Sequence, residues 1–162
     1  MIIKSTYGYL TLLLTTGKTL VPFHLDYDDD DDAFDPISEL SVIYDGIKYR
    51  GKGTNYLWTD TFADLQKNLP EGVSIACCLT CRHGNMCPYG NSENELYCTK
   101  GLKVENKDDL CDLFDAYFTN DPNILLKVSS FNYCDNFVYQ SDEYYTYNDY
   151  LYQPNKKKRT FK

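Results

Sequence analysis

Five of the chain's seven cysteines lie in one stretch, CCLTCRHGNMCPYGNSENELYC, between residues 77 and 98. Two residues separate Cys78 from Cys81, a spacing that lets one tight turn direct two thiolates at a single ion. Cys87 and Cys98 follow around a loop rich in glycine and asparagine. A local four-thiolate metal site made of these four cysteines is therefore one arrangement that the spacing allows.

A cysteine from far along the chain offers a competing ligand set. Cys134, in FNYCDNF, can replace Cys87 as the fourth ligand, and the metal would then tie the late part of the chain to its middle. His83 is a third variation, although its position two residues after Cys81 makes simultaneous ligation of one ion awkward. The spacing leaves these sets open.

Zinc is the metal that the pattern favours, because it accepts four thiolates tetrahedrally and is redox-inert, as a closed structural site requires. An iron–sulfur cluster also takes four cysteines, and spacing does not distinguish it. A redox-active CxxC and buried thiols without any ligand role are the other readings. Cys77 and Cys111 are interpreted as ordinary core or surface thiols.

The same stretch carries a resemblance. LPEGVSIACCLTCRHGNMCPYGN, ELYCTKG and the later YCDNF resemble a group of small bacterial cysteine-rich proteins with an LP-G motif, a CxxC, a Pro-Tyr-Gly loop and two further cysteines. That pattern usually lacks a cysteine at the position of Cys87. The resemblance, which covers about residues 65–137, therefore implies Cys78, Cys81, Cys98 and Cys134 as ligands. It implies no activity, but such proteins are similar in size and style to immunity proteins of bacterial toxin systems.

Catalytic groups are scarce, because the chain holds only two histidines. His24 lies on an expected strand beside Asp26 and is interpreted as a sheet residue. His83 lies near two candidate nucleophiles, Cys81 and Cys87, but no orienting acid is close in the sequence. We therefore expect a non-catalytic binding module. The alternative is a thiol- or iron–sulfur-dependent redox enzyme that uses the same cysteines.

The net charge of −8 argues against binding of nucleic acid or an anionic membrane through the body of the protein. Acidic charge is concentrated in a loop at residues 26–36, whose aspartate run lacks the spaced ligands, glycine and glutamate of a calcium-binding EF-hand. Such a run suits contact with a basic protein partner, such as a nuclease toxin. The predicted partner-binding aspartates are Asp28, Asp29, Asp30, Asp31 and Asp32.

Tyrosine is abundant, at 16 of 162 residues, and favours strands and binding surfaces. The segment DEYYTYNDYLY resembles a strand whose alternate tyrosines face opposite ways. Beside aspartate and asparagine, tyrosine also forms amphipathic recognition surfaces. The predicted partner-binding tyrosines are Tyr144, Tyr145, Tyr147 and Tyr150.

The remaining patterns predict the elements that position these residues. Hairpins are expected at residues 16–18 and at Asp45-Gly46, a dipeptide suited to a type I′ turn. Helices are expected within residues 58–72, capped by Asp60 or Thr61, and from Asn106 onward. A strand should enter the cysteine loop at residues 77–101, and strands should return after residue 122.

These elements predict an α+β fold, a mainly antiparallel sheet or sandwich with two short helices and a cysteine-rich metal-binding loop. We expect one domain over residues 1–155 and a basic tail at 156–162. No segment has the roughly 20 apolar residues of a membrane-spanning helix. A cytoplasmic protein with reduced thiols is expected, and the oligomeric state is left open.

Overall fold

The computed structural model describes residues 2–30, 36–54, 57–90 and 95–150. They form two compact units. Unit 1 contains the described residues up to Ala76 together with Asp149 and Tyr150, and unit 2 is Cys77–Asn148. The single domain over 1–155 stays a prediction, and the basic tail at 156–162 lies outside the described residues.

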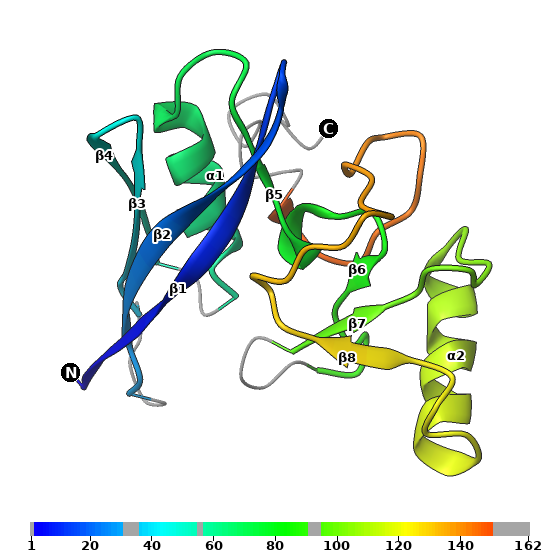
Figure 1. The fold of residues 1–162 in the computed structure, drawn as a ribbon. Coiled ribbons are helices and arrows are strands. Elements are labelled where there is room, and N and C mark those ends of the chain that lie inside the picture. The colour runs from blue at the N-terminus through cyan, green and yellow to red at the C-terminus, as the bar shows by residue number, and fades with distance from the viewer. Residues whose placement is uncertain (1, 31–35, 55–56, 91–94, 151–162) are drawn as a thin grey trace, which may run out of the picture. The chain divides into compact units, whose positions relative to one another are not determined.

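Unit 1 is built on a five-stranded antiparallel sheet with the strand order β4-β3-β2-β1-β5 (Figure 1). Two long strands form its centre, and the short β5 pairs with only three residues of β1, Thr11–Leu13. The strands are β1 (Ile3–Leu14), β2 (Gly17–Asp28), β3 (Ser38–Tyr44), β4 (Ile47–Gly53) and β5 (Ser74–Ala76).

Both predicted hairpins are present. Asp45 and Gly46 connect β3 to β4 with φ angles of 51° and 74°, the left-handed conformation that both central residues of a type I′ turn require. In the first hairpin Leu14 pairs with Gly17, so the turn residues are 15 and 16, slightly before the expected position. The turn chemistry thus fixes the register of both strand pairs.

One face of this sheet carries the core of unit 1. Helix α1 (Thr59–Asn68) packs against β4, where a Cβ on Gly51 would lie 2.3 Å from the backbone nitrogen of Leu65. The core combines alternate strand residues with one helix face: Leu10, Leu12, Val21, Phe23, Leu25, Leu40, Val42, Phe62, Ala63 and Leu65.

The predicted cap of α1 is wrong. The helix begins at Thr59, after Trp58 in the left-handed region at φ 58°, and no side chain caps it. The Asp60 carboxylate instead accepts hydrogen bonds from the backbone N–H groups of Thr54 (2.7 Å) and Thr61 (2.8 Å). The tertiary connection to the end of β4 therefore overrides the local capping preference.

Unit 2 contains a three-stranded antiparallel sheet with the order β6-β7-β8. Its strands are β6 (Gly84–Asn85), β7 (Leu96–Cys98) and β8 (Leu126–Val128), and its helices are the short 3₁₀ turn η1 (Cys78–Thr80) and α2 (Lys107–Thr119). As predicted, Asn106 caps α2, since its side chain accepts a hydrogen bond from the Asp109 N–H (3.0 Å). Its hydrophobic core is Cys87, Tyr97, Leu110, Phe114 and Leu125.

The predicted α+β class is confirmed, with mainly antiparallel strands and two α-helices. The predicted strand in the tyrosine segment is wrong, because residues 129–150 form only an isolated bridge, between Tyr139 and Cys81. The side-chain amides of Gln140 and Asn148 donate to the Leu79 carbonyl at 2.9 and 3.3 Å. Such side chain-to-backbone bonds, together with scattered backbone bonds such as that from the Arg82 N–H to the Val138 carbonyl (2.8 Å), hold this segment without a strand ladder.

Among the described residues, neither α1 nor α2 is long and apolar enough to cross a membrane.

Candidate metal centre

The CxxC motif forms a compact turn in unit 2. Cys78 begins η1, the N–H of Cys81 donates to the carbonyl of Cys78 (3.3 Å), and the N–H of Gly84 donates to the carbonyl of Cys81 (3.0 Å). A Cβ on Gly84 would lie 2.0 Å from the Cys78 carbonyl oxygen, so only glycine allows this approach. The spacing of the two cysteines therefore yields the tight turn that the sequence predicts.

The sheet of unit 2 brings Cys98 to this turn. Gly84 on β6 pairs with Cys98 on β7, and the Thr99 N–H donates to the His83 carbonyl at 3.0 Å. Cys98 therefore lies across a strand pair from the residue that closes the CxxC turn.

A third segment brings Cys134 to the same place. The N–H of Cys78 donates to the Asn132 carbonyl (2.7 Å), and the N–H of Leu79 donates to the Ser130 carbonyl (3.2 Å). Cys134 follows two residues after Asn132, and its carbonyl accepts from the Phe137 N–H at 3.0 Å. Three segments distant in sequence thus meet at the turn.

The electrostatics of the thiols agree with this convergence. The pKa of Cys78 is raised to about 12, chiefly by burial and then by the negative charges that Cys77, Cys81, Cys98 and Cys134 carry when ionised. Burial also raises the pKa of Cys81, and the negative charges of ionised Cys98 and Cys134 contribute to the same increase. Several thiolates this close repel one another, which favours the protonated thiols. A bound cation would favour the thiolates instead.

The side chains as placed do not form a finished ligand shell. Within the described ranges, no three His, Cys, Asp or Glu side chains form a group that could hold a metal ion. The four thiols are electrostatic neighbours, and protonated thiols have no charge that would draw them together around one point. The backbone contacts bring the segments that carry Cys78, Cys81, Cys98 and Cys134 together, which makes these four thiols the candidate ligand set.

The other cysteines have different surroundings. Cys87 is buried in the hydrophobic core of unit 2 beside Tyr97 and Phe114. Cys77 is fully buried, which raises its pKa to about 11. Cys111 lies on α2, and its carbonyl accepts from the Tyr89 hydroxyl at 3.4 Å.

The two histidines lie in different units. His24 on β2 stacks on Tyr7 with ring centroids 4.4 Å apart, and its Nε2 lies 3.0 Å from Oδ1 of Asp26. His83 is half-buried, and its pKa is lowered by burial and then by the positive charges of Arg82 and Lys100.

The predicted acidic loop contains aspartates that are buried or paired within the chain. Asp28 is 7% exposed, and its Oδ1 accepts from the backbone N–H groups of Ile2 (3.0 Å) and Asp30 (3.2 Å). Its carboxylate therefore organises the end of the β1–β2 hairpin. Asp29 forms an ion pair with Lys4. Asp31 and Asp32 lie outside the described residues.

The four tyrosines proposed from the sequence also differ in exposure. Tyr144 is 45% exposed, and the guanidinium of Arg82 lies 3.4 Å from its ring centroid. Tyr145 and Tyr147 pack against the hydrophobic core of unit 2, whereas Tyr150 is buried in unit 1. Tyr144 is thus the member of this set most available to a partner.

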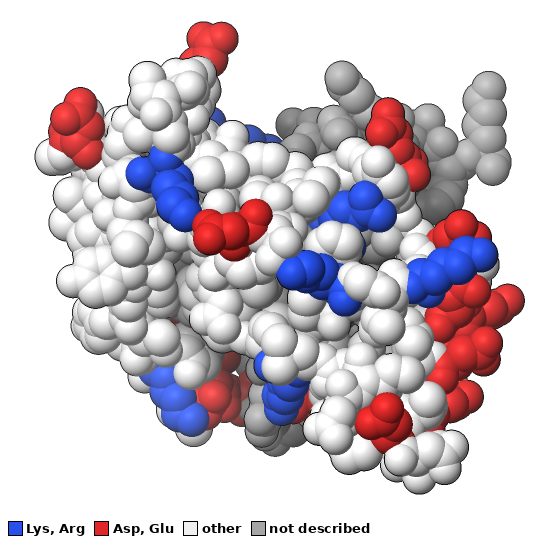
Figure 2. All heavy atoms as spheres, turned by 45° about the vertical axis from the view of Figure 1, so that its right-hand side comes forward, with Lys and Arg blue, Asp and Glu red and all other residues white. Residues whose placement is uncertain are grey.

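Helix α2 carries an acidic stripe that is not among the predicted partner-binding residues. Asp108, Asp112 and Asp115 are exposed and follow one another at intervals of four and three residues, which places them on one face. The opposite face carries Leu110 and Phe114, which are buried. The spacing was readable from the sequence, and acidic side chains also gather along one margin of the face drawn in Figure 2.

Comparison of the chain with protein-family models, with curated proteins and with solved structures found no match.

Proposed function

We propose that this protein is a non-catalytic protein-binding module of the immunity or inhibitor type, stabilised by a structural zinc ion in unit 2. The observation that carries the proposal is the meeting of Cys78, Cys81, Cys98 and Cys134 from three segments of the chain. Four thiolates with no further ligand position suit structural zinc, which needs a closed tetrahedral shell.

The raised thiol pKa values also bear on the alternative, a redox enzyme. A nucleophilic or redox-active cysteine needs a lowered pKa, because the thiolate is the reactive form. Burial raises the pKa of Cys78 and Cys81 instead. Binding of a structural ion by all four thiolates is the role of these cysteines that fits their burial and proximity.

Elemental analysis of the protein, purified without chelators, tests the metal site. We expect one zinc per chain, loss of the metal in Cys134→Ser, and retention in the matched variant Cys87→Ser. Iron with visible absorption would favour the iron–sulfur alternative. Metal-free native protein, or a Cys134→Ser variant that keeps its zinc, would contradict the proposed site.

The partner proposed for this module is a basic protein, such as a nuclease toxin. The acidic stripe of α2 supports this, because Asp112 and Asp115 lie in mid-helix, where like charges three or four residues apart destabilise a helix by about 0.2–0.5 kcal/mol per pair. Such a surface steers a cationic partner and raises the association rate at low salt. Exposed Tyr144 adds an aromatic contact of the kind enriched at interfaces.

Co-purification from the native host, followed by binding measurements on the captured protein, tests the partner. The double variant Asp112→Asn/Asp115→Asn should slow association several-fold at low salt, and the difference should shrink at high salt. Asp45→Asn/Glu71→Gln removes two exposed acids from unit 1 and serves as the charge-matched control. Equal binding by both variants, or a captured protein that is itself acidic, would count against the proposal.

A further inference from the structure

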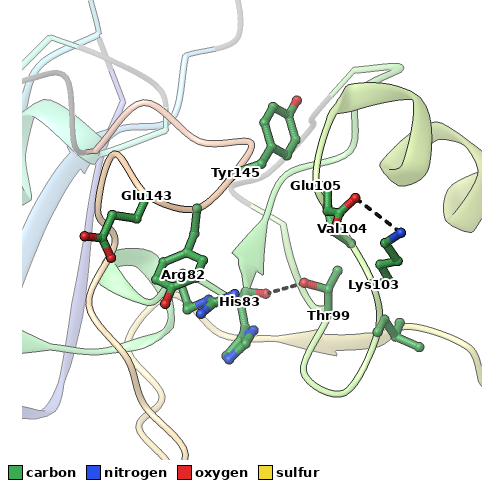
Figure 3. Close-up of a pocket in the computed structure, with 10 residues that line it drawn as sticks. Arg82, His83, Thr99, Lys103, Val104, Glu105, Glu143 and Tyr145 are labelled. Atoms are coloured by element: carbon green, nitrogen blue, oxygen red, sulfur yellow. Dashed lines mark hydrogen bonds and ion pairs between the residues drawn. The ribbon is translucent and has the colours of Figure 1, made fainter.

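A second cluster of chemistry-bearing residues in unit 2 surrounds a pocket of about 410 Å³ (Figure 3). Arg82, His83 and Glu143 lie on one side of it, and Lys103, Val104 and Glu105 lie on the other, with Tyr145 above. The volume falls within the roughly 300–1,000 Å³ of small-molecule sites. It is larger than a lone inorganic ion needs, so the space suits a small organic molecule.

Arg82 is the residue that gives the pocket its chemistry. Its guanidinium is held against the ring of Tyr144, and within the described part of the chain no carboxylate pairs with it. Five other cations of the described residues do have such a partner, namely Lys4, Arg50, Lys52, Lys103 and Lys127. Arg82 therefore keeps its fork of donors available for an incoming oxyanion.

One further positive charge lies near His83, which lines the pocket. Arg82 and Lys100 both lie within electrostatic reach of the His83 ring, and no ion pair of Lys100 occurs among the described residues. These two cations, inside a protein of net charge −8, favour an anion beside Arg82.

The rest of the lining limits what else the ligand can carry. Leu102, Val104 and the ring of Tyr145 provide apolar and aromatic surface for a flat or apolar body. Across the pocket, Glu105 pairs with Lys103 at 3.2 Å, and on the side of Arg82 Glu143 adds a second carboxylate. These acids disfavour a ligand with several negative charges.

We propose that this pocket binds a small organic molecule with one oxyanion head group, a phosphoryl or a carboxylate, and an aromatic body. The head group accepts hydrogen bonds from the guanidinium of Arg82, in the planar geometry that arginine offers to both oxyanions. The body lies between the tyrosine side of the pocket and Leu102. This binding goes beyond the proposed contact with a protein partner, with which it shares Tyr144.

Titration of the intact protein of known metal content with three matched probes tests the site. Binding is measured at pH 7 by calorimetry and by NMR chemical shifts. Phenyl phosphate and benzoate share a ring and differ in head group, and benzyl alcohol lacks the charge. We expect at least one of the two anions to bind with a dissociation constant of about 1 mM or below, as suits a fragment of this size. Benzyl alcohol should bind at least tenfold more weakly.

Variants locate the binding. Arg82→Gln should weaken it at least tenfold, whereas Lys48→Gln, an equal loss of charge on β4 in unit 1, should leave it unchanged. If Arg82→Gln fails to fold, Arg82→Lys keeps the charge without the fork and should bind with reduced affinity. The inference is overturned if neither anion binds at a probe concentration of about 10 mM, tenfold above the expected dissociation constant. It is also overturned if the folded Arg82 variant binds as wild type does. Neither result depends on whether a protein partner exists.

Discussion

Cys87 and Cys134 show how the surroundings of a single residue decide its role. Both are candidates for the fourth ligand when only spacing is considered. Cys87 is 8% exposed and packs against Tyr97 in a hydrophobic core, whereas Cys134 is exposed and acts electrostatically on Cys78 and Cys81. A thiol packed among apolar side chains behaves as a small hydrophobic group. These surroundings support Cys134 rather than Cys87 as the fourth ligand of the proposed site.

A second single residue, Glu95, gives unit 2 a pH dependence. Its carboxylate pairs with Lys127 and accepts from the Tyr97 hydroxyl at 3.1 Å, and the bond to Lys127 is the main cause that lowers its pKa. A lowered pKa in the folded state means that the stabilisation is complete above the ordinary glutamate pKa of about 4.3 and is lost as the pH falls through the lower, folded value.

Urea unfolding of unit 2 between pH 7 and pH 3 measures this effect. Wild-type protein should lose more unfolding free energy over that range than Glu95→Gln, which lacks the titrating carboxyl group. Glu71→Gln, in a turn of unit 1, is the matched control and should behave as wild type. Identical pH slopes for wild type and Glu95→Gln would show that the ion pair adds nothing to stability.

At the scale of elements, helices and hairpins with strong local signals were predictable, and the tyrosine segment was not. Asp45-Gly46 and Asn106 act through their own backbone neighbourhood, so their sequence context is sufficient. In residues 129–150 side chains bond to distant backbone groups, as in the 2.6 Å bond from Asn148 Nδ2 to the Gly84 carbonyl. Composition rich in tyrosine does not reveal such pairings.

Replacing the cap of α2 should have a measurable cost. Asn106→Ala removes the acceptor for the Asp109 N–H and should lower the unfolding free energy by about 1 kcal/mol. Asn120→Ala, at the other end of the helix and exposed, is the control and should change it by less than about 0.5 kcal/mol. Equal effects in thermal or urea unfolding would contradict the role assigned to Asn106.

At the scale of the molecule, the two units differ in what supports them. Unit 1 has a five-stranded sheet and a helix that share a continuous apolar core, including Leu10, Phe23 and Phe62. The strands of unit 2 are two or three residues long, which is too short to hold a sheet by pairing alone. A metal that links three segments would supply the missing constraint.

Removal of metal should therefore act on one unit. After treatment with a chelator, amide hydrogen exchange should accelerate at least tenfold in β6, β7 and η1, while β1 to β4 keep their protection. Restoring zinc should restore the protection. Equal acceleration in both units would show that the ion supports the whole chain, and no change in either would contradict a structural role for metal.

The sequence by itself determined the local features: the turns at positive φ, the cap of α2, the tight CxxC turn and the antiparallel α+β character. The turns, the cap and the CxxC motif each depend on residues within a few positions of one another, and the local strand and helix patterns indicate the fold class. Only the tertiary structure showed that Cys87 is buried and Cys134 exposed, buried Asp28 within a hairpin end, and assembled the pocket around Arg82. Those outcomes depend on contacts between residues tens of positions apart, which spacing and composition do not encode.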